Sequence, residues 1–155
     1  MPSSTPPKSL DRVAIIGAGA MGCLFAARLH EAGASVTLIE ADPERVAGLR
    51  ATGVVIEDDS GSRRVNLRVC TARDVITDVD LIILLTKSLH SRQASRSVAH
   101  LARSRPLALT LQNGLGNAEA LAEVFGADSV LMGTAHVPAD LHPPNRVQST
   151  GHSEV

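Results

Sequence analysis

Hydrophobic residues along the chain fall into short apolar runs that alternate with longer segments of helical spacing. The runs predict strands, and their wholly apolar character is typical of strands covered on both faces. They occupy residues 12–17, 35–40, 80–87, 106–112 and 129–137. Helices are predicted between them, at residues 20–32, 42–50, 91–103 and around 119–124. This alternation predicts an α/β fold with a mostly parallel sheet and helices on both of its faces.

Some segments depart from the alternation. Residues 53–70 contain two alternating runs around the turn sequence Asp-Ser-Gly-Ser, which predicts an inserted β-hairpin. Residues 140–155 are rich in Pro, His and Ser, and only 146–150 within them has a strand pattern. Residues 1–11 are rich in Ser and Pro, so we expect a disordered lead-in there. Residues 12–155 are then expected to form a single domain.

Composition narrows the classes of function. The chain has 155 residues, of which 44% are hydrophobic, enough for one buried core. A formal net charge of −1 gives no attraction to nucleic acid or to an acidic membrane surface. Cys23 and Cys70 lack the spacing of a metal site or a disulfide framework, and the 6 His show no ligand spacing. We therefore expect no bound metal. Because the sequence shows neither a signal peptide nor a long apolar run, we expect a cytoplasmic protein.

A glycine-rich sequence stands where the first strand pattern gives way to the first helix. Gly17, Gly19 and Gly22 form the pattern GxGxxG. In this position the first glycine makes a tight turn, the second lets a pyrophosphate approach the backbone, and the third lets the helix pack closely. The helix N-terminus offers unpaired N–H groups to the phosphates. We therefore expect a Rossmann-type, doubly wound fold whose dinucleotide loop consists of Gly17, Ala18, Gly19, Ala20, Met21 and Gly22, rather than glycines used only for packing.

An acidic residue, Glu40, ends the second predicted strand. A carboxylate in this place accepts hydrogen bonds from the ribose hydroxyls of the adenosine half, and it repels a 2′-phosphate. Glu40 therefore favours NAD over NADP, with a solvated loop charge as the alternative. Asp42 is better explained as a helix cap, because Pro43 follows it at the first helical position.

Two further polar residues follow strands at the edge where open α/β sheets bind ligands. Lys87 ends one apolar run and is a candidate contact for a cofactor phosphate or a substrate carboxylate; the alternative is a lysine that simply caps a strand. Asn113 follows the next strand with a donor and an acceptor on its side chain, although Asn-Gly is also a common turn. Cys23, in the first turn of the glycine-loop helix, is expected to be a packed residue rather than an activated thiol.

Together these motifs resemble the ketopantoate reductase family, formally 2-dehydropantoate 2-reductase. The resemblance rests on the ordered segments "IIGAGAMG", "LLTKS", "LQNGLGN" and "VLMGTAHVPA". It covers residues 12–155 and corresponds to the N-terminal, cofactor-binding domain of that family. By position, it implies that the glycine loop, Lys87 and the backbone of Ala139 contact the cofactor, and that Asn113 contacts both cofactor and substrate.

The resemblance also implies an activity. The family reduces ketopantoate, a small 2-keto acid, to pantoate with NADPH, in the route to pantothenate and coenzyme A. Its catalytic lysine and a supporting glutamate lie in a C-terminal helical domain, so we expect no catalytic residue within residues 1–155. A helical substrate domain or a second copy of the chain is the expected partner. NADPH-preferring members often carry an arginine after the second strand, where this chain has Glu40 and Ala41, so both NADP and NAD remain candidates.

Two other functions share the same loop. One is a dinucleotide-binding sensor or regulatory module without chemistry, and the other is a Rossmann dehydrogenase for a different substrate. The segment "QNGLG" favours an oxidoreductase, because a sensor has no need of an amide beside the nicotinamide.

Overall fold

The structure is a computed structural model, and it describes residues 9–75 and 78–150. Residues 1–8 of the expected lead-in lie outside the described residues, as do residues 151–155 of the Pro/His/Ser-rich segment.

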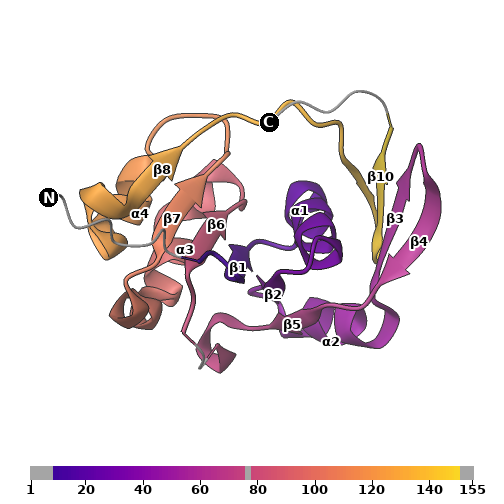
Figure 1. The fold of residues 1–155 in the computed structure, drawn as a ribbon, viewed down its shortest axis with the longest axis horizontal. Helices are drawn as coiled ribbons and strands as arrows, with labels where there is room; N and C mark the ends of the chain where they lie inside the picture. Colours follow the sequence, from indigo (N-terminus) through magenta and orange to yellow (C-terminus); the bar gives the residue numbers. More distant parts are fainter. Residues whose placement is uncertain (1–8, 76–77, 151–155) are drawn as a thin grey trace, which may run out of the picture.

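The centre of the fold is a parallel sheet in which β1 lies in the middle (Figure 1). The strand order is β5-β2-β1-β6-β7-β8, and every neighbouring pair is parallel, which confirms the predicted doubly wound α/β sheet. The strands are β1 (Arg12–Ile16), β2 (Ser35–Ile39), β5 (Arg68–Cys70), β6 (Leu81–Leu84), β7 (Leu107–Thr110) and β8 (Val130–Met132). From β1 the chain builds one half of the sheet through β2 and β5, and it then crosses back to add β6 on the other side of β1, so a topological switch point lies between β1 and β6.

Helices cover both faces of this sheet. Alternate residues of a strand point to opposite faces, so Val13 and Ile15 of β1 enter one apolar cluster while Ala14 and Ile16 enter the other. The first cluster holds side chains of α1 and α2, and the second holds side chains of α3, η3 and α4. These helices are α1 (Ala20–Glu31), α2 (Pro43–Thr52), α3 (Ser91–Ser97), η3 (Ala99–Ser104) and α4 (Asn117–Phe125).

A second sheet lies on the far side of α1 from the main sheet, so α1 is packed between the two (Figure 1). Its strand order is β4-β3-β10-β9. The predicted hairpin supplies β3 (Val54–Asp58) and β4 (Gly61–Val65), which pair in antiparallel register and confirm that prediction. The other two strands are β9 (Asp140–His142) and β10 (Arg146–Ser149). Val54, Ile56, Val65 and Val147 point inward and are buried in the α1 cluster.

The structure differs from the sequence prediction at the ends of several elements. Only the end of the predicted hairpin run, residues 68–70, leaves the small sheet and joins the main sheet as β5, where consecutive Val69 and Cys70 are both buried because this strand is covered on both faces. The last predicted strand stops at Met132, because its partner β7 ends at Thr110, to which Met132 is paired. The predicted helix at 91–103 becomes α3 and then the tighter turn η3. β9 has a polar pattern and forms only against β10.

The helix cap predicted at Asp42 is present. Asp42 is the N-cap of α2, its carboxylate accepts the Glu44 N–H at 2.9 Å, and Pro43 occupies the first turn. Among the described residues, no helix is long and apolar enough to cross a membrane.

We predict that Val147→Ala lowers the free energy of unfolding by about 2 kcal/mol, because it removes buried methyl groups from the contact between β10 and α1. The exposed neighbour Gln148 is the matched control, and Gln148→Ala is expected to change stability by less than about 0.5 kcal/mol. Urea unfolding followed by circular dichroism measures both. Equal stability of the Val147 variant and the parent would show that the second sheet does not share the core.

Candidate functional site

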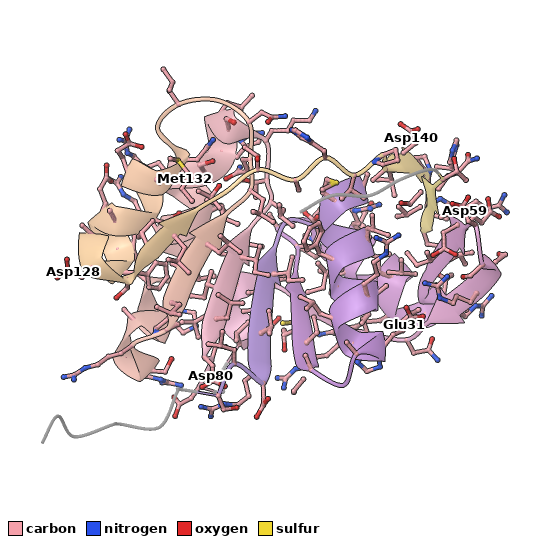
Figure 2. The ribbon with its side chains drawn as sticks, turned by 45° about the horizontal axis from the view of Figure 1, so that its top comes forward. Glu31, Asp59, Asp80, Asp128, Met132 and Asp140 are labelled. Carbon is pink, nitrogen blue, oxygen red and sulfur yellow. The ribbon has the colours of Figure 1, made fainter. Side chains whose placement is uncertain are left out.

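A cavity of about 800 Å³ opens at the carboxyl edge of the main sheet. Asp80 and Glu31 mark the lower ends of β6 and α1 in Figure 2, so the carboxyl ends of the strands and the N-terminus of α1 face the upper side. The glycine loop, the ends of β2 and β6, the turn after β5 and one side of α3 line the cavity. It therefore lies at the switch point, where sheets of this class bind ligands.

Gly17 is required by the backbone of the protein itself. Its φ is +105°, a backbone conformation that residues with a Cβ rarely adopt. Its N–H donates to the carbonyl of Ile39 at 2.8 Å. A Cβ on Gly17 would lie 3.0 Å from the Leu85 carbonyl oxygen. The loop is thus wedged between the ends of β2 and β6.

Gly22 and Gly19 differ sharply in what surrounds them. A Cβ on Gly22 would lie 1.7 Å from the Gly17 carbonyl oxygen, so the first turn of α1 closes against the loop only because this residue has no side chain. A Cβ on Gly19 would meet nothing within 4 Å. No contact within the described protein therefore explains why Gly19 is bare, and the space over it opens into the cavity.

The N-terminus of α1 is open. Gly19 is its N-cap, no side chain caps the first turn, and that turn has no acidic residue. By contrast, Asp42 and Glu44 supply acidic groups to the first turn of α2. The N–H groups and the positive dipole end of α1 are thus available to an anion beside Gly19.

Both backbone groups of Ala18 are held by charged side chains. The Ala18 N–H donates to Glu40 Oε2 at 3.2 Å. The Ala18 carbonyl accepts from Arg45 Nη2 at 2.6 Å and from Arg45 Nε at 3.2 Å. Arg45 also donates to the carbonyl of Pro144 at 3.1 Å, in the turn between β9 and β10. Residues from β2, α2 and the second sheet therefore fix the position of the glycine loop.

Glu40 has further partners. Its Oε1 accepts the N–H of Ala41 at 2.7 Å and of Asp42 at 3.1 Å, and its Oε2 lies 3.8 Å from Arg45 Nε. A carboxylate has about four acceptor positions, and three N–H groups now occupy most of them. Room remains for about one hydroxyl group, while the negative charge stays at the edge of the cavity.

Cys23 is a packed residue, as the sequence indicated. Its side chain is fully buried, and its Sγ lies 3.5 Å from the Ala18 carbonyl oxygen. Burial raises the pKa of the Cys23 thiol to about 11, and the nearby Arg45 offsets this only in part. Desolvation therefore outweighs the nearby cation, and the thiol is not activated.

The carboxyl ends of β6 and β7 carry Lys87 and Asn113. Lys87 is exposed and lines the cavity, and its ammonium has no ion-pair or hydrogen-bond partner among the described residues. The Asn113 carbonyl accepts from Ser88 Oγ at 2.7 Å and from Asn117 Nδ2 at 3.2 Å. Its side-chain amide has no partner in the described part of the chain, so its backbone is held and its amide is left available.

A polar network beneath these two residues was not predicted. The amide of Gln112 donates to the Thr86 carbonyl and, at 3.0 Å, to Ser91 Oγ. Ser91 Oγ in turn donates to Asn117 Oδ1 at 2.7 Å. Ser91 and Asn117 are buried, and the network ties the end of β6 to the end of β7. Ser, Thr, Asn and Gln near strand ends are common in loops, so the sequence carried little signal for it.

The structure brings only some of the predicted site residues to the cavity. Gly17, Ala18, Gly19, Glu40 and Lys87 line it. Ala20, Met21, Gly22, Asn113 and Ala139 do not, and Ala139 is half-buried against the α1 cluster. Arg73 lines the cavity and was not predicted, because it follows β5, which the sequence assigned to the hairpin.

Comparisons of the sequence with known proteins all point to one family. The model of the family "Ketopantoate reductase PanE/ApbA" matches residues 13–155. A 2-dehydropantoate 2-reductase of Halobacterium salinarum is 35% identical over 145 residues, which are 93% of this chain and 48% of that protein. One of Pyrococcus abyssi is 36% identical over 120 residues, which are 77% of this chain and 38% of that protein.

Solved structures show the same likeness. A structure described as a putative 2-dehydropantoate 2-reductase from Enterococcus faecalis has a TM-score of 0.84 and 30% identity, and covers 92% of this chain and 47% of that one. A D-mandelate dehydrogenase in ternary complex with NADH and anilino(oxo)acetate has a TM-score of 0.85 and 28% identity, with 91% and 46% covered. The chain spans about half the length of the curated relatives that it matches.

Proposed function

Because the chain belongs to the ketopantoate reductase family, we propose that residues 12–155 bind a nicotinamide dinucleotide in the cavity at the carboxyl edge of the main sheet. The bareness of Gly19 carries this proposal. Gly17 and Gly22 are explained by backbone conformation and close packing, whereas nothing in the described structure excludes a side chain at Gly19. A pyrophosphate resting on the open N-terminus of α1 would need that space.

The ends of β6 and β7 would serve the nicotinamide half. Lys87 places a cation at the cavity that has no partner among the described residues, and it would attract a phosphate or a substrate carboxylate. Asn113 would offer its side-chain amide to the cofactor and the substrate, with its backbone held by Ser88 and Asn117. The family resemblance adds the backbone of Ala139 near the nicotinamide.

The reaction we propose is reduction of a 2-keto acid, with ketopantoate as the first candidate. The bound dinucleotide supplies the hydride, and the protein must hold the substrate carboxylate and provide a proton to the developing alkoxide. From the family resemblance we expect the proton donor to come from a helical domain outside residues 12–155. The likeness to a D-mandelate dehydrogenase keeps other 2-keto acids as alternative substrates. We expect the reaction to take place in the cytoplasm.

A helical substrate domain would also cover exposed apolar side chains beside the cavity. Leu89, Leu115 and Met132 are 78%, 99% and 76% exposed; Leu89 and Leu115 follow the carboxyl ends of β6 and β7, and Met132 is the last residue of β8. Large apolar side chains exposed at the carboxyl ends of three neighbouring strands are typical of a surface that contacts another domain. We propose that the partner domain closes over this edge and excludes water from the keto acid.

Cofactor choice follows from the charges around the ribose position. The Glu40 carboxylate lines the cavity and can accept a ribose hydroxyl. Arg45, whose Nε lies 3.8 Å from Glu40 Oε2, is held by the carbonyls of Ala18 and Pro144 and would have to break these hydrogen bonds to meet a 2′-phosphate. We therefore propose that the chain prefers NAD(H) to NADP(H).

We predict that Gly19→Val lowers the affinity for NADH at least about tenfold, which corresponds to about 1.4 kcal/mol, and lowers the thermal midpoint only slightly, because valine is a weaker N-cap than glycine. A Cβ on Gly19 meets nothing within 4 Å in the unliganded protein, but a side chain there would occupy the space of the pyrophosphate. Gly48→Val is the matched control, since a Cβ there also meets nothing within 4 Å and Gly48 lies on α2 away from the cavity. Calorimetric titration measures the affinities, and equal binding by the Gly19 variant and the parent would overturn the assignment of the loop.

We predict that the parent chain binds NADH at least about tenfold more tightly than NADPH, because the Glu40 carboxylate repels a second phosphate. Titration of both cofactors under the same buffer and salt measures the ratio. Glu40→Gln removes the negative charge and keeps a hydrogen-bond acceptor, so it is expected to reduce the ratio of the NADH affinity to the NADPH affinity. Tighter binding of NADPH by the parent would contradict the proposal.

We predict that a polypeptide of residues 1–155 binds a dinucleotide but reduces ketopantoate at a negligible rate, because an open site loses most of the advantage of orientation. Fusion to the C-terminal half of a ketopantoate reductase is expected to restore oxidation of the reduced cofactor. The absorbance of the reduced nicotinamide follows both reactions. Robust turnover by residues 1–155 alone would show that catalytic residues lie within them.

A further inference from the structure

We propose that Arg73 forms the adenine-binding wall of the cavity, with its planar guanidinium stacked on the base. This inference rests on the proposed function, because it assigns one end of the same cofactor site. It adds a specific residue, contributed by the turn after β5, to the contacts expected from the glycine loop and the end of β2.

The position of Arg73 follows from the pairing of β5 with β2. Cys70, the last residue of β5, is paired with Ile39, and the Glu40 N–H donates to the Cys70 carbonyl at 3.0 Å. The helical turn η1 (Ala72–Asp74) therefore begins beside Glu40. A dinucleotide with its pyrophosphate on α1 and its ribose at Glu40 places its adenine further along the same direction, toward η1 and the edge strand β5.

The cavity wall at this end suits a flat base. The small apolar side chains of Ala41 and Ala72 line it, and no Phe, Tyr or Trp does. His90, Gln93 and Ala94 line the cavity from the β6 half of the sheet. Arg73 is the planar side chain that this half of the cavity offers to the face of a base, and guanidinium groups stack readily on bases.

Arg73 is also available for such a contact. Its guanidinium has no hydrogen-bond or ion-pair partner among the described residues. The adjacent acid, Asp74, instead accepts from Thr71 Oγ1 at 2.7 Å. Arg45 makes the contrast clear, because its guanidinium is fully engaged by backbone carbonyls of Ala18 and Pro144.

A contact with the base fits the surroundings better than a contact with a 2′-phosphate. With the ribose placed at Glu40 as proposed, a phosphate between the Glu40 carboxylate and Arg73 would be repelled on one side. A stacked base is neutral and needs no counter-charge. Stacking therefore uses Arg73 in a way that the neighbouring carboxylate does not oppose.

The test compares Arg73→Ala and Arg73→Lys with the parent chain, using NADH, NADPH and AMP as probes in calorimetric titrations. Arg68→Ala is the matched control, since Arg68 is an exposed arginine at the opposite end of β5 and does not line this cavity. Arg73→Ala is expected to lower the affinities for NADH and AMP by about three- to tenfold, the range of a cation–π contact. Arg73→Lys is expected to lose nearly as much, because lysine keeps the charge and lacks the plane.

The outcomes separate the alternatives. Unchanged binding of NADH and AMP by Arg73→Ala, or full recovery by Arg73→Lys, would overturn stacking. A loss confined to NADPH would identify Arg73 as a phosphate contact and would equally overturn it. Failure of the parent chain to bind any of the three probes would instead disprove the proposed function, and the inference with it.

Discussion

The arrangement of the carboxyl edge depends on one close backbone contact, in which Gly22 in the first turn of α1 packs against the carbonyl of Gly17 at the end of β1. The Gly17 carbonyl lies where a side chain on Gly22 would have to be, and Gly17 takes a φ of +105° to reach that position. Because of this contact, α1 starts directly over the sheet with its first N–H groups facing the cavity. Any Cβ at Gly22 would force the helix away from β1 and would move the open helix end from the switch point.

The loop that makes this turn is held from three directions. Glu40 at the end of β2 and Arg45 on α2 bind the two backbone groups of Ala18, and Arg45 extends the connection to Pro144. The second sheet is therefore linked to the glycine loop by a hydrogen bond as well as by its packing on α1. A backbone N–H or carbonyl without a partner is costly to bury, so these contacts stabilise one conformation of the loop before any ligand binds.

Charge at the cavity is distributed unevenly between engaged and available groups. Glu40 and Arg45 are tied to the backbone and lie near one another, while Lys87 and Arg73 line the cavity without partners among the described residues. The two available cations come from opposite halves of the sheet, after β6 and after β5. This places positive charge at both ends of a site whose middle is the open N-terminus of α1, as suits an extended ligand with phosphates at its centre.

The sequence alone determined the parallel α/β fold, the glycine loop and the cap of α2, because each depends on local signals: apolar runs, glycine spacing, and Asp42 followed by Pro43. It predicted the hairpin and the strand pattern at 146–150 but not their assembly into a second sheet, since β9 is polar and β10 must pair with β3, about ninety residues earlier in the chain. The roles of Arg45 and Arg73 were likewise decided by tertiary structure. Both are unremarkable arginines in the sequence, and what distinguishes them is which long-range neighbours their guanidinium groups meet: two backbone carbonyls for Arg45, and the open cavity for Arg73.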